Sequence, residues 1–398
     1  MKKGWQTKTL ASISSKITDG SHNPPKGGEE SDYLMLSSKN VFDDDLHYED
    51  PRYLSREQFE QEDRRTGVAP NDVLLTIVGT VGRSAVVPSN PPRITLQRSV
   101  AVIRPERNIV EPRFLMYSLI ERNEDLNARA RGVAQKGIYL ETLRELEVEL
   151  PPLAEQQRIV GLLDEAFEGL ATAKANAEKN LQNARALFES HLQSVFTQRG
   201  PGWVEKHLKE VCEKITDGTH QTPKYFDEGV VFLSSRNVTS GKIDWENIKY
   251  IDTKQHLEMH KRVAPRRGDI LLAKNGTTGV AAIVDRDTVF DIYVSLAHLR
   301  ALPVIRPRFL LHFINSPAAK LQFNKRLKGI GVPNLHLEEI REVRIAFPAD
   351  LKAQDHVVGA LDDLHEETQR LARLYERKQA ALEALNKSLL HQAFTGEL

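Results

Sequence analysis

The chain has 398 residues, 28% of them charged, and its 55 Lys and Arg side chains balance 55 Asp and Glu for a formal net charge of zero. This balance argues against strong nucleic-acid binding by the chain alone, because contacts to phosphate require cationic side chains. No apolar run approaches the ~18 residues of a membrane span, so we expect no membrane association, and the single cysteine, Cys212, rules out an internal disulfide and fits a reducing cytoplasm.

One short phrase is written twice, about half a chain length apart. KITDGSH begins at Lys16 and KITDGTH begins at Lys214. Further pairs follow in the same order, since YLMLSSKNV is repeated as VVFLSSRNV and PRFLMYSLI as PRFLLHFIN. Self-similarity in a fixed order over most of the length indicates a tandem duplication. The segments between the matched phrases differ, which is typical of one scaffold that recognises two different things.

Each copy predicts a mixed α/β domain. The runs DVLLTIV and DILLA are short and aliphatic, so we expect buried strands there. The runs SAVVP and AAIV follow them across glycine-containing turns, which predicts hairpins. Pro112 and Pro307 each stand at the first position of an apolar helical pattern. We expect the two domains at residues 1–150 and 200–348.

Each copy ends in a long helical segment, at residues 151–199 and 349–398. Apolar residues alternate there at intervals of three and four, which is the a/d pattern of a coiled coil. A helix of about 40 residues is about 60 Å long, so its apolar stripe needs a second long helix. We therefore predict an α+β protein in which two tandem domains are separated by two long antiparallel coiled-coil helices with pseudo-twofold symmetry. The predicted seam positions are Val160, Leu163, Phe167, Leu170, Lys174, Ala177, Leu181, Ala184, Phe188, His191 and Val195, and then Leu361, Leu364, Thr368, Leu371, Tyr375, Lys378, Leu382, Leu385 and Leu389.

The sequence shows no complete catalytic motif. NPPK and NPPR lack the aromatic residue of the Asn-Pro-Pro-aromatic motif of adenine methyltransferases, and no Walker-type phosphate loop is present. GTVG at Gly79 and GTTG at Gly276 resemble a phosphate-clamping GXXG loop, although the pattern favours a hairpin turn. We interpret the histidines as lacking a metal-ligand spacing. We therefore predict a protein that is not an enzyme and needs neither a cofactor nor a metal.

Polar side chains recur at corresponding loop positions of the two copies. Arg, Lys, Asn, Gln, Ser and Thr are the side chains that read base edges and hold phosphates. Any one of them can be explained as a turn residue or a solvated side chain, but their recurrence at matching tips favours a shared role. We therefore predict DNA contacts for Ser21, His22, Lys39, Asn40, Thr80, Arg83, Gln135, Lys136, Tyr139, Thr219, His220, Arg236, Asn237, Lys274, Asn275, Thr277, Asn334 and His336.

The phrases KITDGSH/KITDGTH, LSSKNV/LSSRNV, GDILLA and LPPLAEQQRIVGLLDEAF resemble the DNA-specificity subunits of type I restriction–modification enzymes. The resemblance covers essentially the whole chain. It implies two target-recognition domains that each read one half of a split double-stranded DNA target, and two helical regions that set the gap between the halves. It also implies a non-catalytic subunit that binds two methyltransferase (modification) subunits and joins translocase–nuclease (restriction) subunits in the restriction enzyme.

A hypothesis from another class is a coiled-coil scaffold whose globular ends bind proteins and no DNA. The balanced charge fits such a scaffold. The paired polar loop tips and the family phrases oppose it. Binding of mixed-sequence DNA, with and without a methyltransferase partner, separates the two hypotheses.

Overall fold

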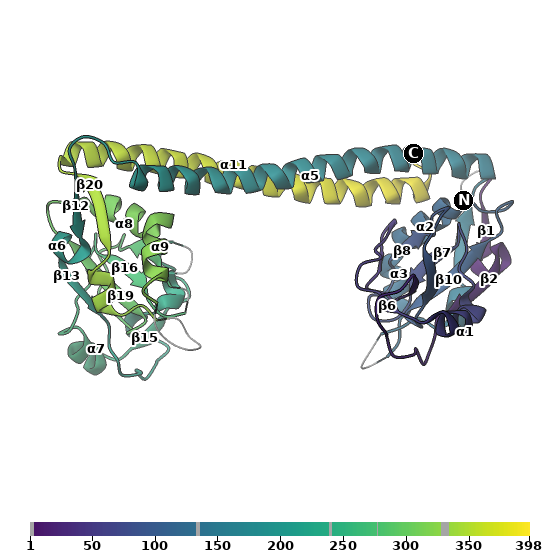
Figure 1. The fold of residues 1–398 in the computed structure, drawn as a ribbon, viewed down its shortest axis with the longest axis horizontal. Coiled ribbons are helices and arrows are strands. Elements are labelled where there is room, and N and C mark those ends of the chain that lie inside the picture. The colour runs from purple at the N-terminus through teal and green to yellow at the C-terminus, as the bar shows by residue number, and fades with distance from the viewer. Residues whose placement is uncertain (1–3, 133–135, 239–240, 277, 328–333) are drawn as a thin grey trace. The chain divides into compact units, whose positions relative to one another are not determined.

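The computed structural model describes residues 4–132, 136–238, 241–276, 278–327 and 334–398. The chain divides into two compact units, and we describe each by itself. Unit 1 comprises Met1–Asn176 and Lys378–Leu398, and unit 2 comprises Ala177–Arg377. Each unit therefore contains one domain and a part of both long helices, α5 (Leu153–Thr197) and α11 (Leu351–Thr395) (Figure 1).

Unit 1 is built on a four-stranded antiparallel sheet of order β2-β10-β7-β8. A second sheet has the order β6-β3-β9, in which β3 and β9 are parallel, and β1 pairs with β11 and β4 with β5. The strands are β1 (Gln6–Thr9), β2 (Ser14–Asp19), β3 (Tyr33–Leu36), β4 (Val41–Phe42), β5 (Asp45–Leu46), β6 (Arg52–Tyr53), β7 (Val73–Thr76), β8 (Ser84–Val86), β9 (Arg93–Leu96), β10 (Val100–Pro105) and β11 (Glu147–Leu150). The helices are η1 (Leu10–Ile13), α1 (Arg56–Thr66), α2 (Pro112–Glu121), α3 (Asn123–Arg129) and α4 (Leu140–Arg144).

Unit 2 repeats this topology. Its four-stranded sheet has the order β13-β19-β16-β17, its three-stranded sheet the order β15-β14-β18, and β12 pairs with β20. The strands are β12 (Trp203–His207), β13 (Cys212–Asp217), β14 (Val230–Leu233), β15 (Lys249–Ile251), β16 (Ile270–Ala273), β17 (Val280–Ile283), β18 (Phe290–Ile292), β19 (Leu296–Ala301) and β20 (Arg344–Pro348). The helices are α6 (Leu208–Val211), η2 (Ser235–Val238), α7 (Thr253–Met259), α8 (Pro307–Asn315), α9 (Pro317–Asn324) and α10 (Leu337–Arg341).

The aliphatic strand runs are explained by burial of the four-stranded sheet on both faces. Val73 and Leu75 of β7 pack on one face with α2 and the long helices, whereas Leu74 packs on the other face against the three-stranded sheet. Since successive side chains of a strand point to opposite faces, a strand buried on both sides must be apolar throughout. Ile270 and Leu271 of β16 divide between two cores in the same way.

Two sequence expectations for local structure are confirmed. The runs DVLLTIV and SAVVP form the antiparallel pair β7–β8, and DILLA and AAIV form β16–β17. Gly79, Gly82, Gly276 and Gly279 of the connecting turns all have φ between 77° and 94°, a backbone conformation that favours glycine. Both PRFL phrases begin helices with proline in the first turn, where the missing N–H costs nothing.

Each domain is fastened to its own long helix by a buried glutamine. Gln156 of α5 accepts the backbone N–H of Glu111 at 2.9 Å and donates to the carbonyls of Ile109 and Pro151. Gln354 of α11 makes the same three bonds in unit 2. Both glutamines are fully buried and fully hydrogen-bonded, so each one joins its long helix to the domain of the same unit.

The long helices pair antiparallel within each unit. In unit 1, Arg158 bonds the carbonyl of Leu398 and Lys174 lies 3.1 Å from Glu383, so the contact runs backwards along α11 as α5 advances. In unit 2, Arg185 pairs with Glu376 at 2.8 Å. No helix among the residues that the structure describes is long and apolar enough to cross a membrane. The pairing direction agrees with the predicted α+β architecture, while the pseudo-twofold relation stays a prediction.

The predicted seam was wrong at several positions. Lys174 and His191 of α5 are exposed, and Leu192 is buried in place of His191. In α11, Lys378 and Leu385 are exposed. A straight helix has 3.6 residues per turn and a heptad pattern 3.5, so a strict alternation drifts out of the interface over a long helix.

Candidate nucleic-acid interface

In unit 1, five loops meet at one end of the four-stranded sheet. This is the end at which β2 and β7 finish and β10 begins, because both strands run antiparallel to β10. Ile138 donates its N–H to the carbonyl of Ile77, and Ser38 donates its N–H to the hydroxyl of Ser99, which ties neighbouring loops together. We call this the loop end of unit 1, and its described residues are 20–22, 37–40, 77–83, 97–99 and 136–139.

Unit 2 has an equivalent loop end. Leu335 donates its N–H to the carbonyl of Lys274, and Ser235 donates to the hydroxyl of Ser295 as Ser38 does in unit 1. Asn275 and Asn334 form a β-bridge, and the side-chain oxygen of each is buried without a hydrogen-bond partner among the described residues. The loop end of unit 2 comprises residues 218–220, 234–237, 274–276, 278–279, 293–295 and 334–336.

The KITDGSH phrase of unit 1 contains a buried carboxylate. Asp19 is 6% exposed and receives hydrogen bonds from His22, at 2.8 Å, and from the guanidinium of Arg65 on α1. Arg65 also donates to the main-chain carbonyl of Asp19 at 2.9 Å. A buried carboxylate requires such donors, so the phrase has a structural role in joining β2 to α1.

The KITDGTH phrase of unit 2 repeats the arrangement with one more cation. Asp217 accepts from Arg262 at 2.5 Å and lies 3.2 Å from Lys274 and 3.3 Å from His220. Burial favours the protonated acid, but the hydrogen bonds from Arg262 and Lys274 outweigh it and hold the pKa of Asp217 below its ordinary value. Lys274 is itself 5% exposed, so its predicted contact with DNA is corrected to a buried ion pair.

The predicted DNA contacts of the two LSS(K/R)N asparagines are also corrected. Asn40 is buried, its Oδ1 accepts the N–H of Ser37 at 3.1 Å, and its Nδ2 donates to the carbonyls of His47 and Glu49. Asn237 repeats this pattern in unit 2. All the hydrogen bonds hold the loop itself, so neither side chain is available to a ligand.

Ser21 is buried as well, and its main chain bridges the loop end. Its N–H donates to the carbonyl of Leu96 and its carbonyl accepts the N–H of Arg98. The neighbouring Gly20 has no room for a side chain, since a Cβ there would lie 2.0 Å from the carbonyl oxygen of Leu96. The predicted contact of Ser21 with DNA is therefore corrected to a main-chain bridge.

The remaining predicted residues are accessible, apart from two that lie outside the described residues, Gln135 and Thr277. Lys39 pairs with Asp50 at 2.6 Å on the surface, and Arg83 lies over the ring of Phe42. Tyr139 is 68% exposed, which is unusual for a large aromatic side chain. The exposed or partly exposed residues are His22, Lys39, Thr80, Arg83, Lys136, Tyr139, Thr219, His220, Arg236, Asn275, Asn334 and His336.

Sequence reasoning missed the loop that follows β9 and β18. Gln97 and the exposed Arg98 occupy this loop in unit 1, and Tyr293 and Val294 occupy it in unit 2. The isolated bridges Ser21↔Gln97 and Thr219↔Tyr293 place these residues at equivalent positions of the two loop ends. The signal was available, because the shared serine that follows aligns LQRSV with IYVSL.

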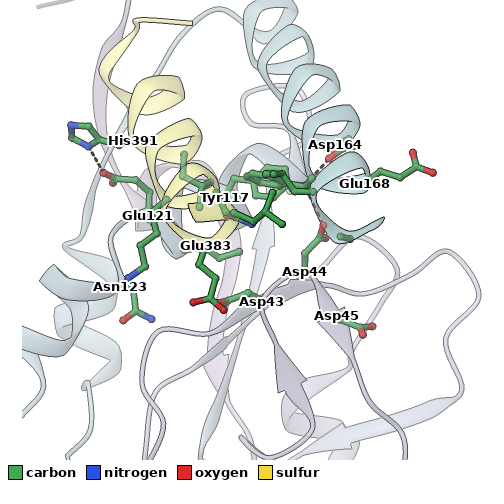
Figure 2. A pocket seen from close by; sticks show the side chains of 18 of the residues that line it. Asp43, Asp44, Asp45, Tyr117, Glu121, Asn123, Asp164, Glu168, Glu383 and His391 are labelled. Carbon is green, nitrogen blue, oxygen red and sulfur yellow. Dashed lines mark hydrogen bonds and ion pairs between the residues drawn. The ribbon is translucent and has the colours of Figure 1, made fainter. Parts of the chain in front are cut away.

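A second surface of unit 1 is an acidic groove of about 1340 Å³ beside the long helices (Figure 2). It lies between the loop Asp43–Asp45, helices α2 and α3, and the paired parts of α5 and α11. Figure 2 shows Glu121, Asp164, Glu168 and Glu383 around it as well. The groove is lined by eight carboxylates and by three Lys and Arg side chains, of which Arg113 and Lys174 are already in ion pairs. This excess of negative charge repels phosphate.

Ion pairs and hydrogen bonds join the residues in the wall of this groove. Arg113 binds Asp164 at 2.8 Å and Asp44 at 2.7 Å, and the hydroxyl of Tyr117 donates to Asp164 at 2.7 Å. Burial, together with the hydrogen bond to Asp164, raises the pKa of Tyr117 well above its ordinary value, so the phenol stays neutral. Unit 2 has the equivalent ion pair between Arg308 and Asp362 at 2.7 Å.

One histidine spacing was overlooked in the sequence. HLEMH places His256 and His260 four residues apart, and the structure brings Asp291 of β18 against both rings. These three are the one group among the described residues whose His, Cys, Asp or Glu side chains lie close enough to share a metal ion. The interpretation that no histidine spacing suits a metal is therefore corrected.

The comparisons with known proteins agree with this architecture. The family model described as "Type I restriction modification DNA specificity domain" matches residues 28–181 and 201–379, one match in each half of the chain. The specificity subunit of the type I restriction enzyme EcoBI from Escherichia coli is 23% identical over 357 residues, covering 83% of this chain and 74% of that protein. The MjaVIII specificity subunit from Methanocaldococcus jannaschii is 22% identical, covering 76% and 74%.

Solved structures show the same fold. One match is a chain from a structure that describes the complex assembly and conformational transition of the type I R-M system. Its TM-score is 0.77 at 20% sequence identity, and the match covers all of this chain and 99% of that one. The HsdS subunit from Thermoanaerobacter tengcongensis has a TM-score of 0.60 at 19% identity and covers 98% of that chain. The two family-model matches together cover most of the chain and show that it belongs to the family of type I restriction–modification DNA specificity subunits.

Proposed function

We propose that this chain reads a bipartite double-stranded DNA target, with one half-site bound by the loop end of each unit. The proposal is supported by the difference between the buried residues of each domain and the exposed residues of its loops. The buried frame is the same in both units, as Asp19 and Asp217 show, whereas exposed positions at equivalent places differ. Gln97 stands where Tyr293 stands, so the two loop ends present different groups to base edges.

Catalysis is left to partners in this proposal. The chain would supply recognition alone and would dock two methyltransferase subunits, and translocase–nuclease subunits would join them in the complete restriction complex. Action on DNA together with these partners implies a cytoplasmic location. Methylation of DNA by the purified chain alone, with S-adenosylmethionine, would contradict the non-catalytic part.

The long helices offer a docking surface for the methyltransferase partners. Leu187 of α5 is 52% exposed and Leu385 of α11 is 47% exposed, and the two occupy equivalent positions of the duplicated helix. We infer that these two leucines contribute apolar contacts to that surface. The acidic groove of unit 1 suits a basic segment of the same partner, because phosphate is repelled there.

Two cations at the loop ends provide a test of the half-site assignment. We expect Lys39→Ala to weaken binding in one half-site. The slope of log affinity against log salt concentration should fall in magnitude by about one, as loss of a phosphate contact does. We expect Arg236→Ala to act on the other half-site, at about 1–3 kcal/mol if the guanidinium contacts a base. Footprinting with the methyltransferase present measures both effects.

The matched control is Lys352→Ala, which removes an exposed lysine from α11 at no loop end. Binding to both half-sites should be unchanged in this variant. Full binding by the folded Lys39 and Arg236 variants would remove these residues from the interface.

The helices should also set the gap between the half-sites. Inserting seven residues into both helices, after Asn176 and after Arg377, adds about 10 Å of helix with little rotation. At roughly 3.4 Å per base pair, the preferred gap should lengthen by about three base pairs while the bases read stay the same. Methylation of a target library with graded gaps measures the shift.

A four-residue insertion in the loop between α5 and β12 is the matched control. Leu192 and Phe196 hold the end of α5 in the core of unit 2, so the loop should absorb the insertion without moving the domain. A gap change with this loop insertion, or an unchanged gap with the helix insertions, would contradict the proposed role of the helices.

A further inference from the structure

Two histidines and an aspartate of unit 2 form a compact cluster beside the loop end, on α7 and β18. Nδ1 of His256 lies 2.7 Å from one carboxylate oxygen of Asp291, and Nδ1 of His260 lies 3.0 Å from the other. The two imidazole rings are 4.6 Å apart between centroids. We propose that His256, His260 and Asp291 bind a divalent cation of the zinc class, a site that goes beyond the proposed DNA-reading function.

The local fold holds the three ligands in place. His256 and His260 are one helical turn apart, so both point from the same face of α7. The side chain of Asp252 caps the first turn by accepting the N–H of Gln255 at 2.7 Å. Asp291 is the middle residue of β18, which is fixed by its parallel pairing with β14.

The buried carboxylate of the cluster needs positive charge or hydrogen-bond donors around it. Asp291 is 1% exposed, while the side chains of His256 and His260 are 16% and 31% exposed. A carboxylate taken out of water needs a cation or several donors, and among the described residues these two rings hydrogen-bond to its side chain. A bound dication would neutralise it fully while remaining open to solvent on the histidine side.

The distances suit a small borderline cation. The three ligand atoms all lie within 4.8 Å of one another. Tetrahedral zinc with bonds of about 2.0–2.2 Å places its ligand atoms about 3.4 Å apart, so side-chain rotations that move each atom by less than about 1 Å would suffice. Two imidazole nitrogens and one carboxylate favour zinc and its transition-metal neighbours over magnesium, which prefers oxygen ligands. Three protein ligands leave a fourth position for water.

Unit 1 lacks the cluster at the equivalent place. Arg65 and Arg262 make the same hydrogen bonds to their aspartates, and this equivalence aligns α1 with α7. In that alignment, Phe59 corresponds to His256 and Asp63 corresponds to His260. Pairing of β9 with β3 places Thr95 where Asp291 stands. An aromatic ring, a carboxylate and a hydroxyl cannot form this ligand set, so the site distinguishes the two units.

The test uses the full chain stripped of metal. We expect calorimetric titration with Zn²⁺ to show one saturable site per chain, Co²⁺ to give the visible spectrum of a tetrahedral site, and Mg²⁺ to show neither. Hydrogen exchange should slow at α7 and β18 when Zn²⁺ is added, because the ion ties helix to strand. The corresponding elements of unit 1, α1 and β9, provide the internal control and should be unaffected.

Three variants assign the ligands. Asp291→Asn keeps the shape of the buried side chain, and His256→Phe installs the residue that unit 1 carries at this position. Each should weaken Zn²⁺ binding at least tenfold and abolish the effect on hydrogen exchange, whereas His191→Gln, an exposed histidine of α5, should change neither. If Asp291→Asn does not fold, His256→Phe decides.

Several results would overturn the proposal. Absence of saturable Zn²⁺ binding would leave the cluster as a set of hydrogen bonds. Unchanged binding in both ligand variants, or loss of binding in His191→Gln, would place the ion elsewhere on the chain.

Discussion

A fragment of residues 1–199 should form a homodimer and, with a methyltransferase subunit, modify a symmetric inverted-repeat target. The fragment keeps the loop end of unit 1 but loses the end of α11, from which Leu390 and Ala393 are buried in the unit 1 core. It also loses Phe394, whose ring packs on Phe114 at 5.1 Å. The exposed apolar surface that results must be covered for the fragment to be stable.

A second copy of the fragment supplies the missing surface. Gln156 and Gln354 align the duplicated helices, so Leu192 and Phe196 of α5 stand where Leu390 and Phe394 stand in α11. Phe196 packs on Phe309 in unit 2 much as Phe394 packs on Phe114 in unit 1. Two α5 helices can therefore pair antiparallel and present two identical loop ends, which requires a target with matching symmetry.

Charge predicts that this dimer is weaker than the native pairing. Lys174 pairs with Glu383 in the full chain, and the residue of α5 equivalent to Glu383 is Arg185. The dimer therefore places Lys174 opposite Arg185 twice. We expect Lys174→Glu to tighten the fragment dimer by about 0.2–1 kcal/mol for each restored pair.

Light scattering measures the association, and sequencing of methylated DNA identifies the target. A monomeric fragment, or a dimer that still modifies the asymmetric target of the full chain, would show that the two halves are not interchangeable. Tightening by Lys174→Ala as strong as that by Lys174→Glu would show that removal of repulsion alone is responsible.

Asp269→Ala should destabilise unit 2 by about 3–5 kcal/mol, because it leaves a cation without its buried partner. Asp269 is 2% exposed and accepts from His298 at 2.7 Å and from Arg300 at 2.9 and 2.7 Å. It also accepts the N–H of Arg266, which fixes the turn before β16. The loss of unfolding free energy is measured by denaturant unfolding, with hydrogen exchange of the amides of unit 2 as the readout.

The same carboxylate makes unit 2 sensitive to acid. Burial alone would raise its pKa, but hydrogen bonds from His298 and Arg300 outweigh burial and hold the pKa of Asp269 far below its ordinary value of 3.8. A depressed pKa contributes stability that is complete above the unfolded value and is lost as the pH falls through the folded value. The difference between wild type and Asp269→Ala should therefore be constant near neutral pH and shrink below about pH 4.

The matched control for this prediction is Asp287→Ala. Asp287 pairs with Arg267 at 3.3 Å, but the two side chains are 77% and 65% exposed. An exposed pair contributes ~0–1 kcal/mol, so this variant should unfold almost as wild type does. Equal losses in the two variants would mean that burial does not determine the effect.

Much of the candidate site could be predicted from the sequence, but not which polar residues are accessible. The repeated phrases correctly indicated the loops that gather at the loop ends, and Lys39 and Arg236 are exposed there. Asn40 and Asn237 recur for a different reason, since both hold their own loop together. A duplicated polar residue is retained equally well for a buried hydrogen bond and for a ligand, so recurrence alone cannot separate the two roles.

The sequence by itself determined the duplication, the aliphatic strands, the proline-led helices and the two long amphipathic segments, because each depends on local periodicity or self-similarity. Only the tertiary structure decided the phase of the helix seam, in which Leu192 is buried and His191 exposed, since small departures from the heptad accumulate along a helix. Only the fold brings Asp291 to His256 and His260, because strand pairing joins residues that are distant in the chain.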